Sequence, residues 1–185
     1  NALIVTPSAD YDLAVADIVK SAFGHAGQKC SAASLVILVG SVAKSERFRR
    51  QLMDAVTTLR VGYPDNPESV MGPVIEPPGS KLTSGLTELG PGENWLLTPQ
   101  LLDDEGRLWS PGVREGVKPG STFHQTEYFG PILGIMSAKS LDEAISFQNG
   151  VDYGLTAGIH SLDPNEVAHW LDRVHAGNCY VNRGI

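Results

Sequence analysis

The segment from Ser34 to Val39 is apolar from Leu35 onward; it has the length of a β-strand but lacks the polar alternation of a strand with one face in water. A strand of this kind is covered on both faces, as in parallel sheets that carry helices on each side. The run therefore predicts a layered α/β fold.

Strand-like and helix-like segments alternate at both ends of the chain, which favours a mainly parallel sheet with right-handed crossovers and helices on both faces. The expected strands are residues 2–5, 34–39, 131–136, 155–160 and one that starts at Tyr180. The expected helices run from Asp10 to Gly24, along the apolar stripe from Phe48 to Leu59, from Ser140 to Gln148, and from Asp163 towards Gly177.

The segment between Gly62 and Gly120 is rich in proline and glycine, and it reads mostly as loops. Within it we expect a helix around residues 80–89 and short strands near residues 95–97 and 112–117. In open parallel sheets, ligands bind beyond the carboxyl ends of the strands. We therefore expect a site in the loops that carry Cys30, Glu127 and Asn182.

Composition restricts the classes of function. The net charge is −7, with no dense basic cluster, so nucleic-acid binding is not expected. The chain has no apolar stretch long enough to cross a bilayer and no signal-peptide pattern, which indicates a cytoplasmic protein. The two cysteines lack CxxC spacing and the five histidines lack metal-ligand spacing, so we expect reduced thiols and no bound metal.

The segment Gly27-Gln28-Lys29-Cys30-Ser31-Ala32 is a small polar loop between a helix and a strand. A thiol reacts as the thiolate, so a catalytic cysteine needs partial exposure and nearby backbone N–H groups, a helix end or a cation. Gly27 allows a close backbone approach, and Ser31 and Ala32 are too small to cover the sulfur. The alternative is that Cys30 is a small buried hydrophobic residue.

Five segments occur in an order that resembles the aldehyde dehydrogenase superfamily. They are the Cys30 loop, Met71-Gly72-Pro73-Val74-Ile75, Glu127-Tyr128-Phe129-Gly130-Pro131, Asn149 through Thr156, and Gly177-Asn178-Cys179-Tyr180-Val181-Asn182. Within the superfamily, Cys30-Ser31-Ala32 and residues 180–184 most resemble the Δ1-pyrroline-5-carboxylate dehydrogenase branch. Residues 127–134 and 169–174 resemble the dehydrogenase half of bifunctional proline utilisation A proteins.

The resemblance implies NAD-dependent oxidation of a small-molecule substrate, L-glutamate 5-semialdehyde, to L-glutamate in proline catabolism. Cys30 matches the nucleophile, which forms a thiohemiacetal and then a thioester. Glu127 and Phe129 match positions that hold the nicotinamide half of NAD, and Ser31 matches a hydroxyl that binds the α-carboxylate of the substrate.

Each of these roles has a structural alternative. Residues 127–131 also read as a turn that leads into a strand, with Phe129 in the core. Ser31 also fits simple small-residue packing. Asn182 either shapes the site through a neighbouring loop or caps backbone groups at a strand end.

By the same resemblance, the general-base glutamate and the NAD-binding domain lie before Asn1, and the main substrate anchor and the oligomerisation flap lie after Ile185. We therefore expect residues 1–185 to form a single, truncated catalytic domain with little or no turnover alone. The parent enzyme is expected to be a homo-oligomer.

Three other functions stay open. A noncatalytic α/β binding module with a structural cysteine differs in thiol reactivity, because only an activated Cys30 alkylates faster than Cys179. A Cys–His hydrolase needs His25 or His124 within hydrogen-bond reach of the sulfur. A dehydrogenase for a different aldehyde differs only in the substrate anchor.

Overall fold

The computed structural model describes all residues from 1 to 185, and its centre is a seven-stranded sheet of order β3-β4-β5-β2-β1-β6-β7. The strands are β1 (Ala2–Val5), β2 (Leu35–Val39), β3 (Asn94–Leu97), β4 (Gly112–Glu115), β5 (Ile132–Ala138), β6 (Thr156–His160) and β7 (Asn178–Val181). All neighbouring strands are parallel except β3 and β4. The predicted mainly parallel α/β sheet is confirmed.

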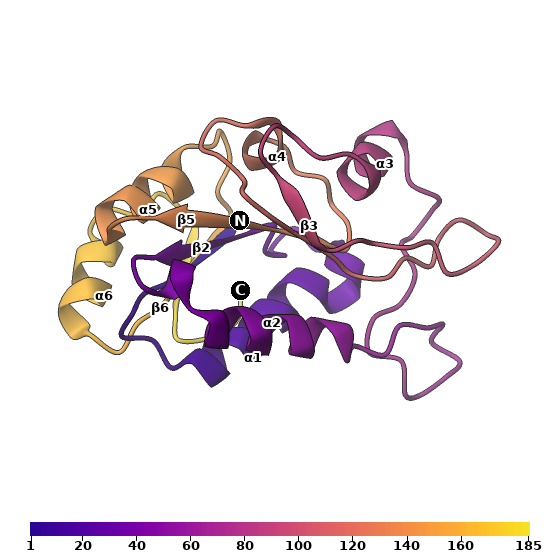
Figure 1. The fold of residues 1–185 in the computed structure, drawn as a ribbon, viewed down its shortest axis with the longest axis horizontal. Helices are drawn as coiled ribbons and strands as arrows, with labels where there is room; N and C mark the ends of the chain where they lie inside the picture. The colour runs from indigo at the N-terminus through magenta and orange to yellow at the C-terminus, as the bar shows by residue number, and fades with distance from the viewer.

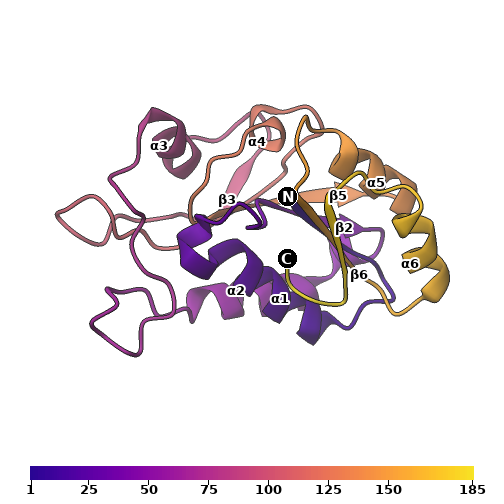
Figure 2. The ribbon, with the colours of Figure 1, turned by 180° about the vertical axis from the view of Figure 1, so that it is seen from behind.

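Helices cover both faces of the sheet. The helices α1 (Tyr11–Phe23) and α2 (Glu46–Thr57) pack together on one face, and α5 (Leu141–Asn149) and α6 (Pro164–Leu171) lie on the other, as Figure 1 and the reverse view in Figure 2 show. The short helices α3 (Ser80–Thr87) and α4 (Thr122–Gln125) lie near the β3 end of the sheet. None of these helices combines the length and apolar character needed to cross a membrane.

Three helices are capped at the residues where the sequence predicts that they begin. The Asp10 side chain accepts hydrogen bonds from the backbone N–H groups of Asp12 (3.0 Å) and Leu13 (3.1 Å) at the start of α1. Ser140 caps α5, and Asp163 caps α6 ahead of a proline at the first helical turn. These contacts satisfy N–H groups that have no partner inside the helix.

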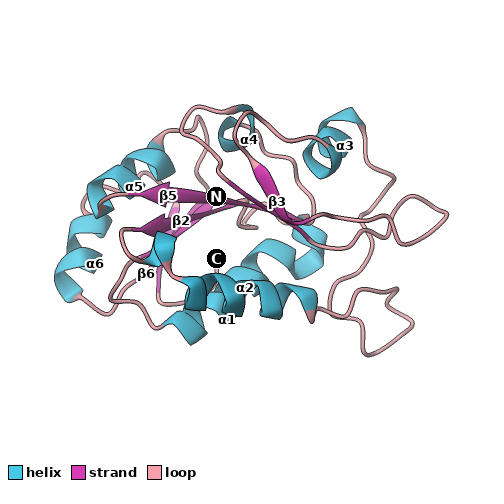
Figure 3. Cartoon of the chain, viewed as in Figure 1, coloured by secondary structure: helices cyan, strands magenta, loops and turns pink.

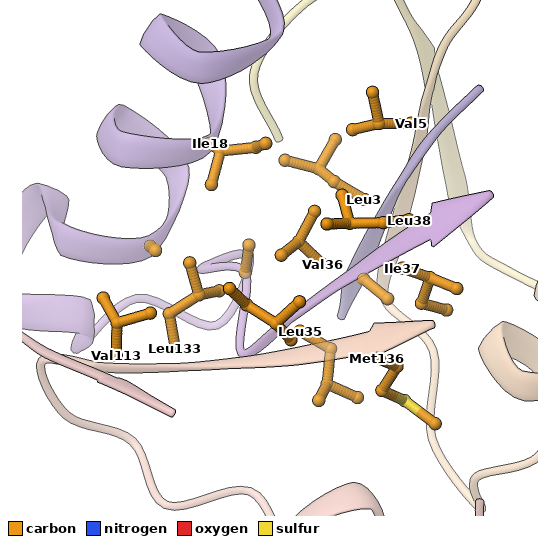
Figure 4. Packing of buried hydrophobic residues seen from close by; sticks show 14 of the residues in the cluster. Leu3, Val5, Ile18, Leu35, Val36, Ile37, Leu38, Val113, Leu133 and Met136 are labelled. Atoms are coloured by element: carbon orange, nitrogen blue, oxygen red, sulfur yellow. The ribbon is translucent and has the colours of Figure 1, made fainter. Parts of the chain in front are cut away.

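The core follows from the apolar run of β2, of which every residue from Leu35 to Val39 is buried. Successive side chains of β2 point to opposite faces of the sheet. Figure 4 shows Val36 and Leu3 on the side that Ile18 of α1 covers, and Met136 on the opposite side. Burial on both faces explains the absence of polar alternation.

The proline-rich middle of the chain is mainly loop, and two long loops project beyond one end of the sheet (Figure 3). The predicted helix and strands are present there as α3, β3 and β4. The short helix α4 was not predicted.

A second difference from the sequence prediction concerns α6, which ends at Leu171 rather than continuing towards Gly177. Trp170 is fully buried, whereas the adjacent Leu171 is 50% exposed. The Trp170 indole contacts Gln148 of α5. The adjacent side chain of Leu171 points in a different direction, because successive residues on a helix are about 100° apart.

Candidate active site

The loop that carries Cys30 begins in an unusual backbone conformation. His25, Ala26 and Gly27 all have positive φ, at 54°, 55° and 69°. A left-handed conformation costs about 1–2 kcal/mol for a residue with a side chain. At Gly27, a Cβ atom would also overlap the carbonyl oxygen of Gly130. Glycine is required here because two loops meet backbone to backbone.

Gln28 joins three of the motifs that the sequence separates. Its side-chain N–H donates to the carbonyl of Phe129 (3.1 Å), and its side-chain oxygen accepts from the backbone N–H of Ile75 (2.8 Å). One amide therefore fixes the cysteine loop against both the Glu127–Pro131 segment and the Met71–Ile75 segment. In the sequence, Gln28 stands only as part of the cysteine motif, and the residue pattern gives no sign of these two contacts.

Asn1 and Thr156 hold the loop from its other side. The Asn1 side chain donates to the carbonyls of Cys30 (2.7 Å) and Ala32 (3.1 Å) and accepts from the N–H of Thr156 (3.0 Å). The Thr156 hydroxyl donates to the carbonyl of Ser31 (3.2 Å). Neither role could be predicted, because nothing in the residue pattern indicates contacts between positions so far apart in the chain.

Cys30 itself is exposed to solvent, which excludes the buried packing role considered from the sequence. The backbone N–H groups of Cys30 and Ser31 donate no hydrogen bond within the chain. The loop therefore presents a thiol beside free backbone donors, while its carbonyls are held. Free N–H groups next to a nucleophile can stabilise a negatively charged oxygen.

Glu127 and Phe129 lie against the cysteine loop. A small cavity of about 20 Å³ is lined by both residues and by Gly27 and Lys29. Glu127 is exposed, and Phe129 is 37% exposed with φ at 59°. The alternative in which Phe129 packs in the core is therefore wrong. Its strained backbone is held by Gln28 and by the packing of Gly130 against Gly27.

Tyr153 is a further polar residue near Glu127 that the sequence analysis did not single out. Burial raises the pKa of the Tyr153 phenol, and the negative charge of Glu127 raises it further. Tyr153 also lines a cavity with Asn1 and Thr156. The only signal in the sequence was its place inside the segment from Asn149 to Thr156.

The site lies at the opposite edge of the sheet from the one expected. The Cys30 loop precedes β2, the Glu127 loop precedes β5, and Thr156 starts β6, so all three lie at the amino ends of parallel strands. Asn182 lies at the carboxyl edge, where its side chain pairs with the N–H and the carbonyl of Ser161, each at 2.9 Å. The carboxyl-edge prediction is wrong for the cysteine site, and Asn182 is a backbone cap.

Neither histidine of the hydrolase alternative hydrogen-bonds to Cys30. His124 is buried, and its Nε2 lies 2.8 Å from the carbonyl of Phe147, while its Nδ1 accepts from the N–H of Gly120 (2.9 Å). His25 is exposed and lines a separate groove of about 740 Å³ with Gln28, Met71 and Ile75. The structure therefore gives no support to a Cys–His pair.

The fold and the site together define a class: a parallel α/β domain that presents an exposed thiol on a fixed loop at the amino edge of its sheet. Comparison with known proteins makes the class specific. The family model described as "Aldehyde dehydrogenase family" matches residues 1–185. The chain belongs to the aldehyde dehydrogenase family.

Individual relatives agree over the whole chain. A 1-pyrroline-5-carboxylate dehydrogenase from Geobacillus sp. (strain WCH70) is 35% identical over 183 residues, which cover 98% of this chain and 35% of that protein. The structure of Proline Utilization A (PutA) from Corynebacterium freiburgense matches with a TM-score of 0.97 and 63% identity, covering 100% of this chain and 19% of that one. A 1-pyrroline-5-carboxylate dehydrogenase from Thermus with bound NAD matches with a TM-score of 0.88 and 34% identity, covering 100% and 35%. The chain thus spans about a third of the length of the curated relatives it matches.

Proposed function

We propose that the full-length protein oxidises L-glutamate 5-semialdehyde, the open form of Δ1-pyrroline-5-carboxylate, to L-glutamate with NAD in proline catabolism. The observation that carries the proposal is the whole-chain similarity to Proline Utilization A, at 63% identity. The similarity to 1-pyrroline-5-carboxylate dehydrogenases supports the same substrate.

Cys30 is the nucleophile in this proposal. Its thiolate attacks the aldehyde carbon, a C–S bond forms, and the carbonyl electron pair moves to oxygen. The backbone N–H groups of Cys30 and Ser31, which donate to nothing else in the chain, are the proposed donors to the resulting oxyanion. Loss of hydride from the same carbon leaves a thioester on Cys30, and attack by water then releases the carboxylic acid and restores the thiol.

Glu127 and Phe129 would hold the cofactor. Glu127 takes no part in the hydrogen bonds that fix its loop, so its exposed carboxylate can accept both ribose hydroxyls. The exposed ring of Phe129 offers a flat apolar surface to a nicotinamide. Bound NAD supplies the acceptor for the hydride. The presence of both groups beside the cysteine loop fits this cofactor.

Ser31 would bind the α-carboxylate of the substrate. Its backbone carbonyl is held by Thr156, whereas its half-buried hydroxyl has no hydrogen-bond partner in the chain. A hydroxyl on a fixed backbone beside the nucleophile can recognise a carboxylate at a defined distance from the aldehyde. The same geometry allows other aldehydes that carry a carboxylate.

We also propose that residues 1–185 are the catalytic domain of the longer protein, with the general base and the NAD-binding domain supplied by its other parts. The share of the relatives' length that the chain covers, 35%, supports this division. The full-length protein is further proposed to be a homo-oligomer in the cytoplasm. The two free cysteines fit a reducing compartment.

The test is to follow NADH formation by the full-length protein with glutamate semialdehyde, and with pentanal as an aldehyde that lacks the amino and carboxylate groups. We expect efficient turnover of the semialdehyde only. Cys30→Ser should abolish turnover, whereas the matched Cys179→Ser should retain it. Equal use of both aldehydes, or activity in Cys30→Ser, would contradict the proposal.

A further inference from the structure

A stack of side chains lies behind the loop that carries Glu127 and Phe129. The Arg114 guanidinium carbon is 4.5 Å from the ring centre of Trp95 on one side and 4.1 Å from that of Phe123 on the other. Phe123 in turn stacks on Tyr128, with ring centres 5.0 Å apart and planes at 23°. The order of the stack is Trp95, Arg114, Phe123, Tyr128, and Tyr128 lies between the two cofactor candidates in sequence.

The backbone makes room for this stack at defined positions. Trp95 and Arg114 are direct partners across β3 and β4, and Arg114 and Gly134 are partners across β4 and β5. A Cβ atom on Gly134 would overlap the ring of Phe123, and one on Gly85 would overlap the ring of Tyr128. Both rings therefore occupy space that only glycine leaves open.

Arg114 also fixes the stack through hydrogen bonds. Its side chain is 2% exposed, and Nη1 donates to Glu93 Oε2 at 2.8 Å. Nη2 donates to the carbonyl of Gly85, the residue that packs on the Tyr128 ring. Planar stacking and two directional bonds together are a property of arginine that lysine does not reproduce.

The last ring of the stack, Tyr128, lies between two exposed residues in the chain. Tyr128 is 8% exposed, whereas its neighbours Glu127 and Phe129 both face solvent. Phe129 has a strained backbone, which persists only where the surrounding structure holds it. Gln28 and the Gly27–Gly130 contact hold one side of Phe129, and the buried Tyr128 holds the other.

We propose that Arg114 is a positioning residue that, through Phe123 and Tyr128, holds Glu127 and Phe129 in the conformation that binds NAD. This inference rests on the proposed function for its cofactor. It assigns to the Trp95–Arg114–Phe123–Tyr128 stack the preorganisation of the cofactor loop, and hence an effect on NAD affinity rather than on the chemistry at Cys30.

The test uses Arg114→Lys in the full-length protein, which keeps the charge but loses the planar stack. We expect the KM for NAD to rise about tenfold while kcat changes less than about twofold, because ground-state binding is lost but the chemical step is not. The backbone amide of Ile132, which donates to the carbonyl of Gly130 (2.8 Å), should also exchange hydrogen faster. Arg107→Lys is the matched control, because Arg107 stacks on Tyr63 in a different part of the molecule.

If Arg114→Lys fails to fold, Tyr128→Phe and Tyr128→Leu decide the question. Phenylalanine keeps the ring and should retain the KM for NAD, whereas leucine should raise it. A folded Arg114→Lys with wild-type KM and exchange, or equal KM values for the two Tyr128 variants, would overturn the inference. Absence of NAD-dependent turnover in the wild type would instead refute the proposed function. In that case, comparing amide exchange in the wild type and in Arg114→Lys would still test whether Arg114 orders the loop.

Discussion

At the scale of single residues, the site depends on a few polar side chains that hold backbone carbonyls and leave N–H groups free. Asn1 and Thr156 bind the carbonyls of the Cys30 loop, and Gln28 binds the neighbouring loops. In the proposed function, rigid support of this kind would keep the Cys30 nucleophile and its oxyanion donors in place before substrate arrives. Most of these supporting residues lie far from Cys30 in sequence, so their pairing required the structure.

Gly27 provides a sharp test of this support. Gly27→Ala should lower the free energy of unfolding by about 2–4 kcal/mol, because it adds both a left-handed alanine and an overlap with Gly130. Gly24→Ala is the matched control, since a Cβ there meets nothing within 4 Å. Urea unfolding measures both. Similar losses for the two variants would show that the loop contact is not the cause.

At the scale of elements, the sequence predicted most helices and strands because their local signals agree with their tertiary environment. The apolar run of β2 and the caps at Asp10, Ser140 and Asp163 are examples. The helix α4 was missed because it is only four residues long (Thr122–Gln125), too short to show a helical period. The edge of the sheet that carries the site was also mispredicted. That prediction rested on the general rule that ligands bind beyond the carboxyl ends of parallel strands, because the residues themselves do not indicate the edge.

The contact between α5 and α6 is predicted to depend on Gln148. Its side-chain oxygen accepts from the indole N–H of the buried Trp170 (2.7 Å), and its amide donates to the carbonyl of Ala2 (2.9 Å) in β1. Gln148→Leu leaves the buried indole N–H of Trp170 without a partner and removes the bond to Ala2, and it should cost about 1–3 kcal/mol. The matched control, Gln100→Leu, changes an exposed residue and should have little effect. Equal thermal unfolding midpoints for the two variants would contradict this role.

At the scale of the whole molecule, the two edges of the sheet carry different features. The amino edge gathers the cysteine loop, the Glu127 loop and Thr156, while the carboxyl edge holds packing and capping contacts such as that of Asn182. The order of motifs along the chain predicted the family, which the comparisons confirm. The order of the motifs did not predict that Gln28 and Asn1 connect them by hydrogen bonds, because hydrogen bonds between distant loops leave no periodic pattern in the sequence.

The stability of the whole domain is predicted to fall in mild acid because of His160. This residue is buried, with Nε2 3.5 Å from Asp17 Oδ2, and burial lowers the pKa of its imidazole below the usual 6.5 although Asp17 and Asp10 oppose the shift. The unfolded chain then binds the proton more readily than the folded one. His160 therefore favours the folded state fully above about pH 6.5, and this contribution is lost as the pH falls below that value.

Urea unfolding at neutral pH and in mild acid measures this effect. His160→Gln should weaken the loss of stability between the two conditions, whereas the exposed control His25→Gln should leave it unchanged. A His160→Gln variant with the full acid dependence of the wild type would assign that dependence to other groups.

The central claim is that the Cys30 loop presents an activated nucleophile, and competitive alkylation tests it most directly. Both cysteines are exposed, so accessibility alone predicts similar labelling. The full-length protein is treated with limiting iodoacetamide near neutral pH, and the two cysteine-containing peptides are quantified by mass spectrometry over time. Our account predicts that Cys30 is labelled at least about tenfold faster than Cys179, because only Cys30 lies on a fixed loop with free backbone N–H groups beside its sulfur. Equal and slow labelling of the two would contradict it and favour a binding module with a structural cysteine.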